Sequence, residues 1–497
     1  MNTYIKSSKL LLVLLLLKYD LINSYDLIYM SFNSSNKPDY NYMYSFIDDL
    51  ATRNLYTIMN IGDPASKLKT LFSSQNEYFG LIPNKKINQN NTDMKYDYTK
   101  SKTFKNITCL NEYIFESRSD ILAHEKFSIK AINYQNNINK EIILDDFNMI
   151  LGVNSKYQSN EYYISLGLKK IMEYKNLDKK KFNFIYQLKE KKIINSYYFC
   201  FFFEKGINEN GIYLYNPDEL FNANGELIIG DLPSNYMPNK YHKNQLFSTY
   251  SYDKDLINSW GLEFSSIYHY NRKNQTVKDP YFSVYFDFNN HLVQAPKSYY
   301  YQIKSEFFKD YLSKKICNIY KGNGFEAIYC NKSENFKINN LYEFPVLYLK
   351  SNELQYTFKF TYQDLFVEKD NRYWFLITFP IYYEVEEWYF GIIFLRKYTL
   401  IFNTDAKTIS FYNPNIPIEE EGDNNNIYIK KNNKKIMIII ICIIILCLIF
   451  IGLGVLIAKI LYYNKKTKKR YNELEDNFEY VSQEQKDNAY PSNSINA

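Results

Sequence analysis

Short apolar runs separated by polar turns dominate the chain between about residues 50 and 415. The clearest runs are at 197–203, 226–230, 281–288, 344–349, 356–362 and 398–403. They are rich in aromatic and β-branched residues and are bounded by Asn, Asp, Gly or Lys, which is the pattern of β-strands. Only two stretches, 184–195 and 297–314, have the pattern of a helix. The sequence therefore predicts a mostly β protein.

The first 24 residues have a different layout. Lys6 and Lys9 precede the run "LLLVLLLL" (10–17), and polar residues follow as far as Ser24. The apolar core is too short to span a bilayer, and a basic start, an apolar core and a polar end are typical of a secretory signal peptide. We therefore expect residues 1–24 to be a signal peptide rather than the start of a buried helix.

A second apolar segment, residues 436–458, contains no charged residue and is long enough to cross a hydrocarbon core about 30 Å thick. Together with the signal peptide, this transmembrane helix predicts a single-pass type I membrane protein of the secretory pathway, in an endomembrane or at the cell surface. The lumenal or extracellular part would begin with a propeptide or N-terminal extension (25–50). It would end in a polar juxtamembrane stalk (416–435). Residues 459–497 would form the cytosolic tail.

The net charge of +6 comes from the flanks of the predicted span. Ten basic residues lie there: Lys430, Lys431, Lys434, Lys435, Lys459, Lys465, Lys466, Lys468, Lys469 and Arg470. Without them the remaining Lys and Arg are slightly fewer than the 54 Asp and Glu, so the composition does not indicate a nucleic-acid partner.

The predicted tail offers one candidate partner site. The stretch "YNEL" (471–474) has the Tyr-x-x-apolar form that endocytic sorting adaptors bind, although a chain with 52 tyrosines can contain this form by chance. The basic stretch "KKTKKR" (465–470) favours contact with anionic lipids.

Cysteine usage agrees with an oxidising compartment. Cys317 and Cys330 would close a short loop and are the expected disulfide, a link worth about 3 kcal/mol in the chain-entropy model. The sequence does not decide whether Cys109 pairs with Cys200. Five Asn-x-Ser/Thr sequons predict a glycoprotein: Asn33, Asn90, Asn106, Asn274 and Asn331.

The β region contains a coarse internal repeat. Each half has a strand-and-turn element followed later by an apolar run that ends in Gly. The elements are "TLFSSQ" (70–75) and "MILG" (149–152) in the first half, and "VYFDFNN" (284–290) and "WYFG" (388–391) in the second. The repeat predicts two similar β lobes that face each other, at residues 51–235 and 236–415.

Across residues 50–415 the chain resembles the pepsin-like aspartic peptidases (peptidase A1). The matching stretches are "YTIMNIGDP" (56–64), "FNMILG" (147–152), "GELIIG" (225–230), Trp260, "WYFGIIFLRKYTLIFN" (388–403) and "ISF" (409–411). They occur in the order and at the spacing of the family. The resemblance implies an all-β, bilobal pepsin-like fold, here with an added C-terminal transmembrane helix.

The family needs two aspartates, one from each lobe, that share one proton. The resemblance places the second at Asp287, nine residues before Pro296 in "DFNNHLVQAP". In the first loop the family's Asp stands twelve residues after the Ile of its Ile-Gly motif, which is Ile61 here. That position is Ser73, and no Asp occurs anywhere from 64 to 92. The resemblance therefore implies a degenerate active site with one catalytic carboxylate retained.

The residues that support the family's two loops differ as well. In the family a Thr or Ser beside each Asp bonds across the lobes, which Ser74 can still do and Phe288 cannot. Family glycines allow close approach of backbone and substrate. Gln75 and Asn289 replace them, and we expect both to crowd that space.

The family's flap over the substrate, Tyr-Gly-x-Gly-Ser, corresponds to "YIFES" (113–117). Tyr113 and Ser117 are retained as candidate substrate-binding residues, together with Ser74. Both flap glycines are replaced, by Ile114 and Glu116, so the mobile hairpin lid of the family is not expected.

The resemblance leaves two functional hypotheses. The first is a membrane-tethered pepsin-like pseudoenzyme that binds a peptide or protein partner and needs no cofactor. The second is a divergent endopeptidase that still cleaves through Asp287. A Ser-His-Asp triad of Ser73, His291 and Asp287 is a remote third alternative, because the chain has neither the elbow motif nor an oxyanion-hole motif. The four histidines, His124, His242, His269 and His291, lack the spacing of a metal site.

Overall fold

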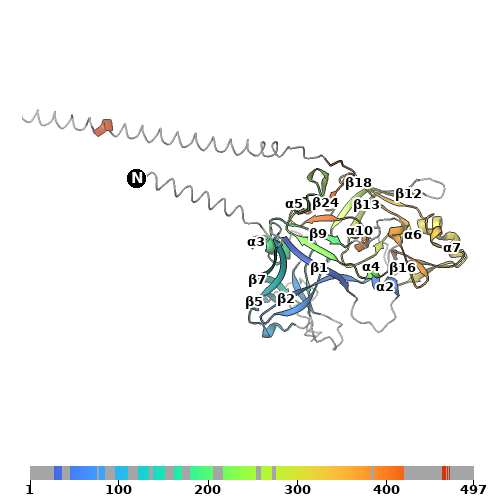
Figure 1. Cartoon of the computed structure of the whole chain (residues 1–497), viewed down its shortest axis with the longest axis horizontal. Coiled ribbons are helices and arrows are strands. Elements are labelled where there is room, and N and C mark those ends of the chain that lie inside the picture. Colours follow the sequence, from blue (N-terminus) through green and yellow to red (C-terminus); the bar gives the residue numbers. More distant parts are fainter. Residues whose placement is uncertain are drawn as a thin grey trace, which may run out of the picture. The chain divides into compact units, whose positions relative to one another are not determined.

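The computed structural model describes residues 27–35, 45–74, 78–83, 96–109, 121–133, 138–151, 162–170, 179–204, 217–252, 259–270, 276–381 and 386–418, and beyond them 462–465, 467 and 470. Residues up to 418 form one compact unit and the later residues a second (Figure 1). Within the described part of the chain, no helix is long and apolar enough to cross a membrane. The predicted signal peptide (1–24) and transmembrane helix (436–458) lie outside the described residues.

The described strands of the first unit form two large sheets. The first has 13 strands, in the order β11 (Leu246–Tyr250), β24 (Thr408–Tyr412), β23 (Leu400–Asn403), β9 (Tyr198–Phe203), β10 (Gly225–Ile229), β1 (Leu27–Ser35), β2 (Asn54–Ile61), β3 (Ser66–Leu71), β8 (Tyr162–Ser165), β4 (Gly80–Pro83), β7 (Ile138–Leu151), β6 (Ile121–Asn133) and β5 (Lys105–Cys109).

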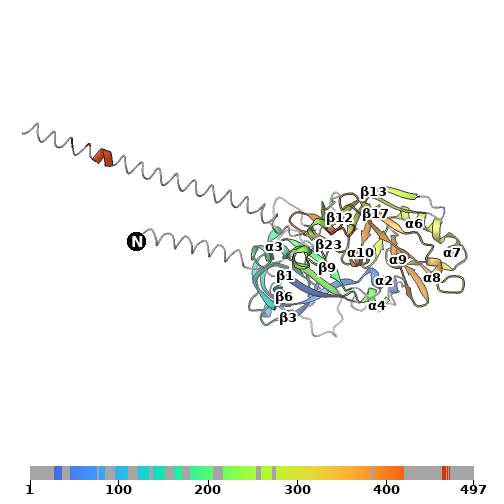
Figure 2. The ribbon, with the colours of Figure 1, turned by 45° about the horizontal axis from the view of Figure 1, so that its top comes forward.

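The second sheet has 11 strands, with β15 (Cys317–Lys321) paired to β16 beside the main order. That order is β18 (Tyr356–Phe360), β17 (Leu347–Ser351), β12 (Gly261–Tyr270), β13 (Thr276–Phe286), β22 (Trp388–Phe390), β14 (Val293–Gln294), β21 (Ile377–Pro380), β16 (Phe325–Asn331), β20 (Arg372–Phe375) and β19 (Phe366–Lys369). Figure 2 shows the two sheets as neighbouring lobes of one unit. A mostly β, two-lobed architecture is therefore present.

The two sheets do not divide at residue 235. β11, β23 and β24 follow that point in the sequence, yet all three belong to the first sheet, where β23 pairs with β9. The strands that connect the lobes thus come from both halves of the chain. β23 is buried along its whole length, and its residues Leu400, Ile401 and Phe402 are apolar on both faces, as expected for a strand that is covered on both sides.

The predicted strands at 197–203, 226–230, 281–288, 344–349, 356–362 and 398–403 correspond to β9, β10, β13, β17, β18 and β23. The predicted helices are also present, as α3 (Phe184–Glu190) and as the continuous α6 (Lys297–Ile303), π-helical η4 (Lys304–Phe308) and α7 (Lys309–Ser313). Short helices not predicted are α2 (Phe46–Ala51), α4 (Pro217–Phe221), α5 (Pro233–Tyr236), α8 (Ile338–Leu341), α9 (Tyr362–Leu365) and α10 (Ile392–Lys397), with 3-10 turns η1 (Tyr98–Lys100), η2 (Lys179–Phe182) and η3 (Lys243–Gln245). Most span about one turn, too short to show a helical period.

The N-terminal segment is built into the fold. β1 lies between β10 and β2, with Met30 paired to Leu227. The α2 helix that follows carries a capping box, in which Ser45 and Asp48 bind each other's backbone N–H. The Asp48 carboxylate also accepts a hydrogen bond from the Tyr320 hydroxyl in the second lobe. The segment predicted as a propeptide or N-terminal extension therefore contributes an internal strand and an inter-lobe contact.

The cysteines of the described part occupy two environments. Cys317 and Cys330 are paired across the β15–β16 hairpin and form a disulfide. Cys200 is a buried free thiol whose Sγ lies 3.4 Å from the Tyr236 hydroxyl. Burial raises the pKa of Cys200 to about 12, so the thiol is neutral and unreactive. Since Cys200 is free, it forms no disulfide with Cys109.

Candidate functional site

Asp287 follows the last residue of β13, at the start of the second lobe's loop. β13 runs parallel to β22, and Phe286 is paired with Phe390. The Asp287 N–H donates to the carbonyl oxygen of Phe390 (3.0 Å), so the next pair along the ladder sets Asp287 opposite Gly391. A Cβ on Gly391 would lie 2.1 Å from the carbonyl oxygen of Asn290, so this close approach requires glycine.

Ser73 has the same place in the first lobe. β3 runs parallel to β8, with Leu71 paired to Ser165. The Leu168 N–H donates to the carbonyl oxygen of Ser73 (2.9 Å), which sets Ser73 opposite Gly167. Gly167 has a φ of 64°, and a Cβ there would lie 2.3 Å from a backbone oxygen. Ser73 and Asp287 therefore occupy equivalent positions in the two lobes. Each lies opposite a glycine, Gly167 or Gly391, where nearby backbone atoms leave no room for a Cβ.

The stretch predicted as the first-half counterpart of "WYFG" (388–391) in the internal repeat was the wrong one. The repeat matched "MILG" (149–152) to "WYFG" (388–391), but residues 149–151 belong to β7, which pairs with β6 and β4. The counterpart of 388–391 is "ISLG" (164–167), because β8 pairs with β3 as β22 pairs with β13. Both stretches are apolar and end in Gly, so the sequence alone did not distinguish them.

Ser74 joins the two loops. Its hydroxyl donates to Asp287 Oδ1 (2.8 Å) and accepts from the Phe288 N–H (3.3 Å). A second bond across the lobes runs from the Trp260 indole N–H to the carbonyl oxygen of Leu168 (2.7 Å). The cross-lobe bond that the resemblance allowed for Ser74 is thus formed, and all of these side chains are buried or half-buried.

The Asp287 carboxyl is half-buried and held at one oxygen. Oδ1 accepts from the Ser74 hydroxyl and also from the Asn289 N–H (2.9 Å). Desolvation raises the pKa of Asp287 above its usual range, while these two hydrogen bonds oppose that rise. Among the described residues, Asp287 has no cationic partner that would favour the carboxylate.

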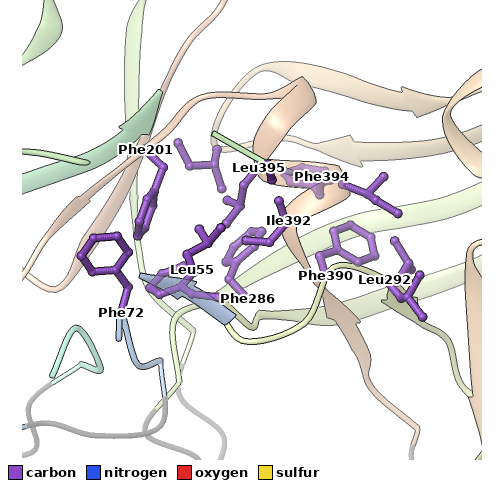
Figure 3. Close-up of a cluster of buried hydrophobic side chains, with 14 of the residues drawn as sticks. Leu55, Phe72, Phe201, Phe286, Leu292, Phe390, Ile392, Phe394 and Leu395 are labelled. Carbon is purple, nitrogen blue, oxygen red and sulfur yellow. The ribbon is translucent and has the colours of Figure 1, made fainter. Parts of the chain in front are cut away.

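Phe288, which stands where the family has Ser or Thr, faces the core. It is fully buried, and its ring lies 5.0 Å from that of Phe201, 5.5 Å from Phe402 and 6.3 Å from Phe199. The neighbouring apolar cluster appears in Figure 3, where Phe201 and Phe286 are labelled. Phe288 therefore packs beneath the loops and does not obstruct them.

Asn289 replaces a family glycine and remains half-buried. Its N–H supports Asp287, but its side-chain Oδ1 is buried without a hydrogen-bond partner in the described structure. An unsatisfied buried acceptor costs stability, so the Asn289 side chain contributes unfavourably at this position. The crowding expected at this position stays a prediction.

His291 is not assembled into a triad. Its backbone N–H donates to the carbonyl oxygen of Leu50 (3.3 Å), whereas both ring nitrogens are buried without a partner in the described structure. Burial, with a smaller effect of nearby Arg53 and Arg396, lowers the pKa of His291 to about 3. The hydrogen bonds on Asp287 come from Ser74 and Asn289 and none comes from His291, so the third alternative is wrong in this structure.

The remaining candidates cannot be placed. Tyr113 and Ser117 of the flap, and Gln75 of the first loop, lie outside the described residues. Among the residues that the structure describes, no group of His, Cys, Asp and Glu could hold a metal ion. The site that can be described therefore consists of Ser73, Ser74 and the loop from Asp287.

Comparison with known proteins supports the fold. No protein-family model matches the sequence, and no curated protein does. Among solved structures, conglutin gamma, a basic 7S globulin from lupine seeds, aligns with a TM-score of 0.50 at 11% identity over 79% of this chain and 95% of its own. Basic 7S globulin from soybean aligns with a TM-score of 0.49 at 13% identity over 78% of this chain and 96% of its own. The likeness to conglutin gamma supports a pepsin-like fold at a coarse level and carries no information on activity.

Proposed function

We propose that this chain is a membrane-tethered, pepsin-like protein without peptidase activity, and that its inter-lobe site binds a peptide or protein segment in the secretory pathway. The observation that carries the proposal is the register of the two loops. Ser73 lies opposite Gly167 as Asp287 lies opposite Gly391, so a serine hydroxyl stands where the second carboxylate is needed.

The chemistry follows from this replacement. Pepsin-like cleavage requires a carboxylate that takes a proton from water and a neutral carboxyl that polarises the scissile carbonyl. A serine hydroxyl does not accept a proton at acidic or neutral pH, and the His291 ring nitrogens make no hydrogen bond in the described structure through which this ring could act as a base. Asp287 alone can be either the carboxylate that takes a proton from water or the neutral carboxyl that polarises the carbonyl, but not both at once.

The retained features favour binding over a purely structural role. Ser74 still joins the loops, and both close glycine contacts are kept. A half-buried carboxyl without a cationic partner costs stability, whereas an apolar residue there would not. The alternative hypothesis, a divergent endopeptidase that uses Asp287, depends on the same carboxyl. A cleavage assay distinguishes it from the hypothesis of a binding protein without activity.

The proposal of membrane tethering rests on the sequence alone. The apolar run at 436–458 and the signal-like segment at 1–24 would place the β unit in the lumen or outside the cell. The stretch at 471–474 would then be available to cytosolic sorting adaptors.

Binding is tested by affinity selection. The full-length chain in detergent is incubated with a mixed-sequence decapeptide library, and retained peptides are identified by mass spectrometry. We expect a subset of peptides to be retained, and Asp287→Leu to reduce their retention at least about tenfold through loss of the hydrogen bond between the Asp287 carboxyl and the peptide. Tyr250→Ala, at a side chain 80% exposed on β11, is the matched control and should not change retention. Equal retention by Asp287→Leu, or no retained peptide, would refute the proposed function.

A further inference from the structure

We propose that the site selects peptides that carry an acidic side chain, and that the ammonium group of Lys69 binds this carboxylate. The inference rests on the proposed function and deepens it, because it names the class of peptide. It concerns a surface of the first lobe that leads to Ser73.

The two faces of β3 and of the residues that follow it differ. The residues of one face are fully buried against the core: Leu68, Thr70 and Phe72, the last of which is labelled in Figure 3. The alternate residues Lys69 and Leu71 are half-buried and point the other way. The backbone stays extended as far as Ser73, because the carbonyl oxygens of Leu71 and Ser73 accept from the N–H groups of Leu166 and Leu168. Lys69, Leu71 and Ser73 therefore share one face.

Cross-strand pairs between β3 and β2 widen this face into a strip of six residues. The pairs are Tyr56 with Leu71, Ile58 with Lys69, and Asn60 with Lys67. Opposite residues of an antiparallel pair project to the same side of the sheet, with Cβ atoms about 4.5–5.5 Å apart. Ile58 is 41% exposed and Lys67 is exposed, whereas the other four are half-buried. The strip contains two lysines and no acidic residue, and one of its ends borders Ser73.

The Lys69 side chain leans toward the Ser73 end of the strip. Its Nζ lies 4.3 Å from the centroid of the Tyr56 ring, which is a cation–π contact. Because Tyr56 is paired with Leu71, this contact turns the lysine toward Ser73 rather than toward Asn60. The Cα atoms of Lys69 and Ser73 are four residues apart along the chain, about 13 Å at a rise of about 3.3 Å per residue. An extended peptide of five residues spans this distance, so one peptide can reach both positions.

Partial burial prepares the Lys69 ammonium for an anion. Desolvation lowers the pKa of Lys69 to about 8, so the group has lost part of its hydration and is still charged at weakly acidic pH. A peptide carboxylate that reaches Nζ replaces this lost hydration, and the lysine has already been desolvated during folding. A neutral side chain of the same shape, such as glutamine, gains much less. Lys67 is exposed and its charge is screened by solvent, so we assign the selectivity to Lys69.

The experiment uses the full-length chain in detergent at about pH 6.5 and two matched decapeptide libraries, in which each member of the first carries one Glu and its counterpart in the second carries Gln. We expect the wild-type chain to retain at least about fivefold more of the Glu library. Lys69→Met should retain both libraries at the level of the Gln library, and Lys69→Glu should prefer a third library with Lys at that position. Lys350→Glu, at an exposed lysine on β17, makes the same change in net charge and should keep the wild-type preference.

Lys69→Met decides the question even where charge reversal disturbs the fold, because it keeps a long apolar side chain at a half-buried position. Equal wild-type retention of the Glu and Gln libraries would overturn this inference and leave the proposed function standing. A preference for Glu that persists in Lys69→Met would also overturn it. So would complete loss of both libraries in that variant, which would indicate a structural role. No retention of either library by the wild type rejects the inference together with the proposed function.

Discussion

Replacing Phe288 by threonine should lower the free energy of unfolding by about 3–5 kcal/mol, although threonine is a residue that the family accepts at this position. The ring is fully buried and packs against Phe201 and Phe402, so the truncation leaves a cavity in the floor beneath both loops. The introduced hydroxyl would also be buried among aromatic rings. The measurement is urea-induced unfolding of the full-length chain, followed by tryptophan fluorescence.

Two comparisons make the Phe288 result decisive. Tyr250→Ala removes an aromatic ring of similar size that is 80% exposed, and we expect a change within about 0.5 kcal/mol. Phe288→Leu keeps most of the apolar volume and should cost less than the threonine variant. A loss below about 1 kcal/mol for Phe288→Thr would mean that the ring does not pack in this core.

Acid should destabilise the chain through His291. The pKa of this ring is lowered to about 3 in the folded state, from an ordinary value near 6.5. Between these values the unfolded chain binds a proton that the folded chain does not, so stability is lost as the pH falls below about 6.5. The loss approaches roughly 4–5 kcal/mol near pH 3, at about 1.4 kcal/mol per pH unit.

The variant His291→Leu tests this origin. Because both ring nitrogens lack partners, an apolar side chain of similar size should cost little at pH 7. The variant should then gain stability over the wild type progressively as the pH is lowered, measured by urea unfolding at several pH values. Parallel pH profiles of the two proteins would contradict the assignment to His291.

The register of both loops was predictable because it depends on short local spacings. Pro296 lies nine residues after Asp287, and Ser73 lies twelve after Ile61, in segments that form regular strands. The strand that borders the first loop was not predictable. Which of β7 and β8 lies beside β3 is decided by long-range pairing, and both carry an apolar run that ends in glycine.

The directions of the side chains at the site could not be predicted from the sequence either. The hydroxyl of Ser74 could be assigned a cross-lobe bond by analogy, but the convergence of two donors on Oδ1 of Asp287 depends on the closed loop. Phe288 was expected only to fail as a hydrogen-bonding residue. Its packing into the core follows from the aromatic strands β9 and β23, which come from distant parts of the chain.

The central claim is that the site keeps one carboxyl, that of Asp287, and has no peptidase activity. It is tested most directly by incubating the full-length chain with the mixed peptide library between about pH 4 and pH 7 and searching for new termini by mass spectrometry. We expect no cleavage above that of a heat-inactivated sample, and little turnover even when Ser73→Asp is combined with Gln75→Gly, since Asn289 still occupies a glycine position. Cleavage by the wild-type chain that is blocked by pepstatin and abolished by Asp287→Asn would contradict the account.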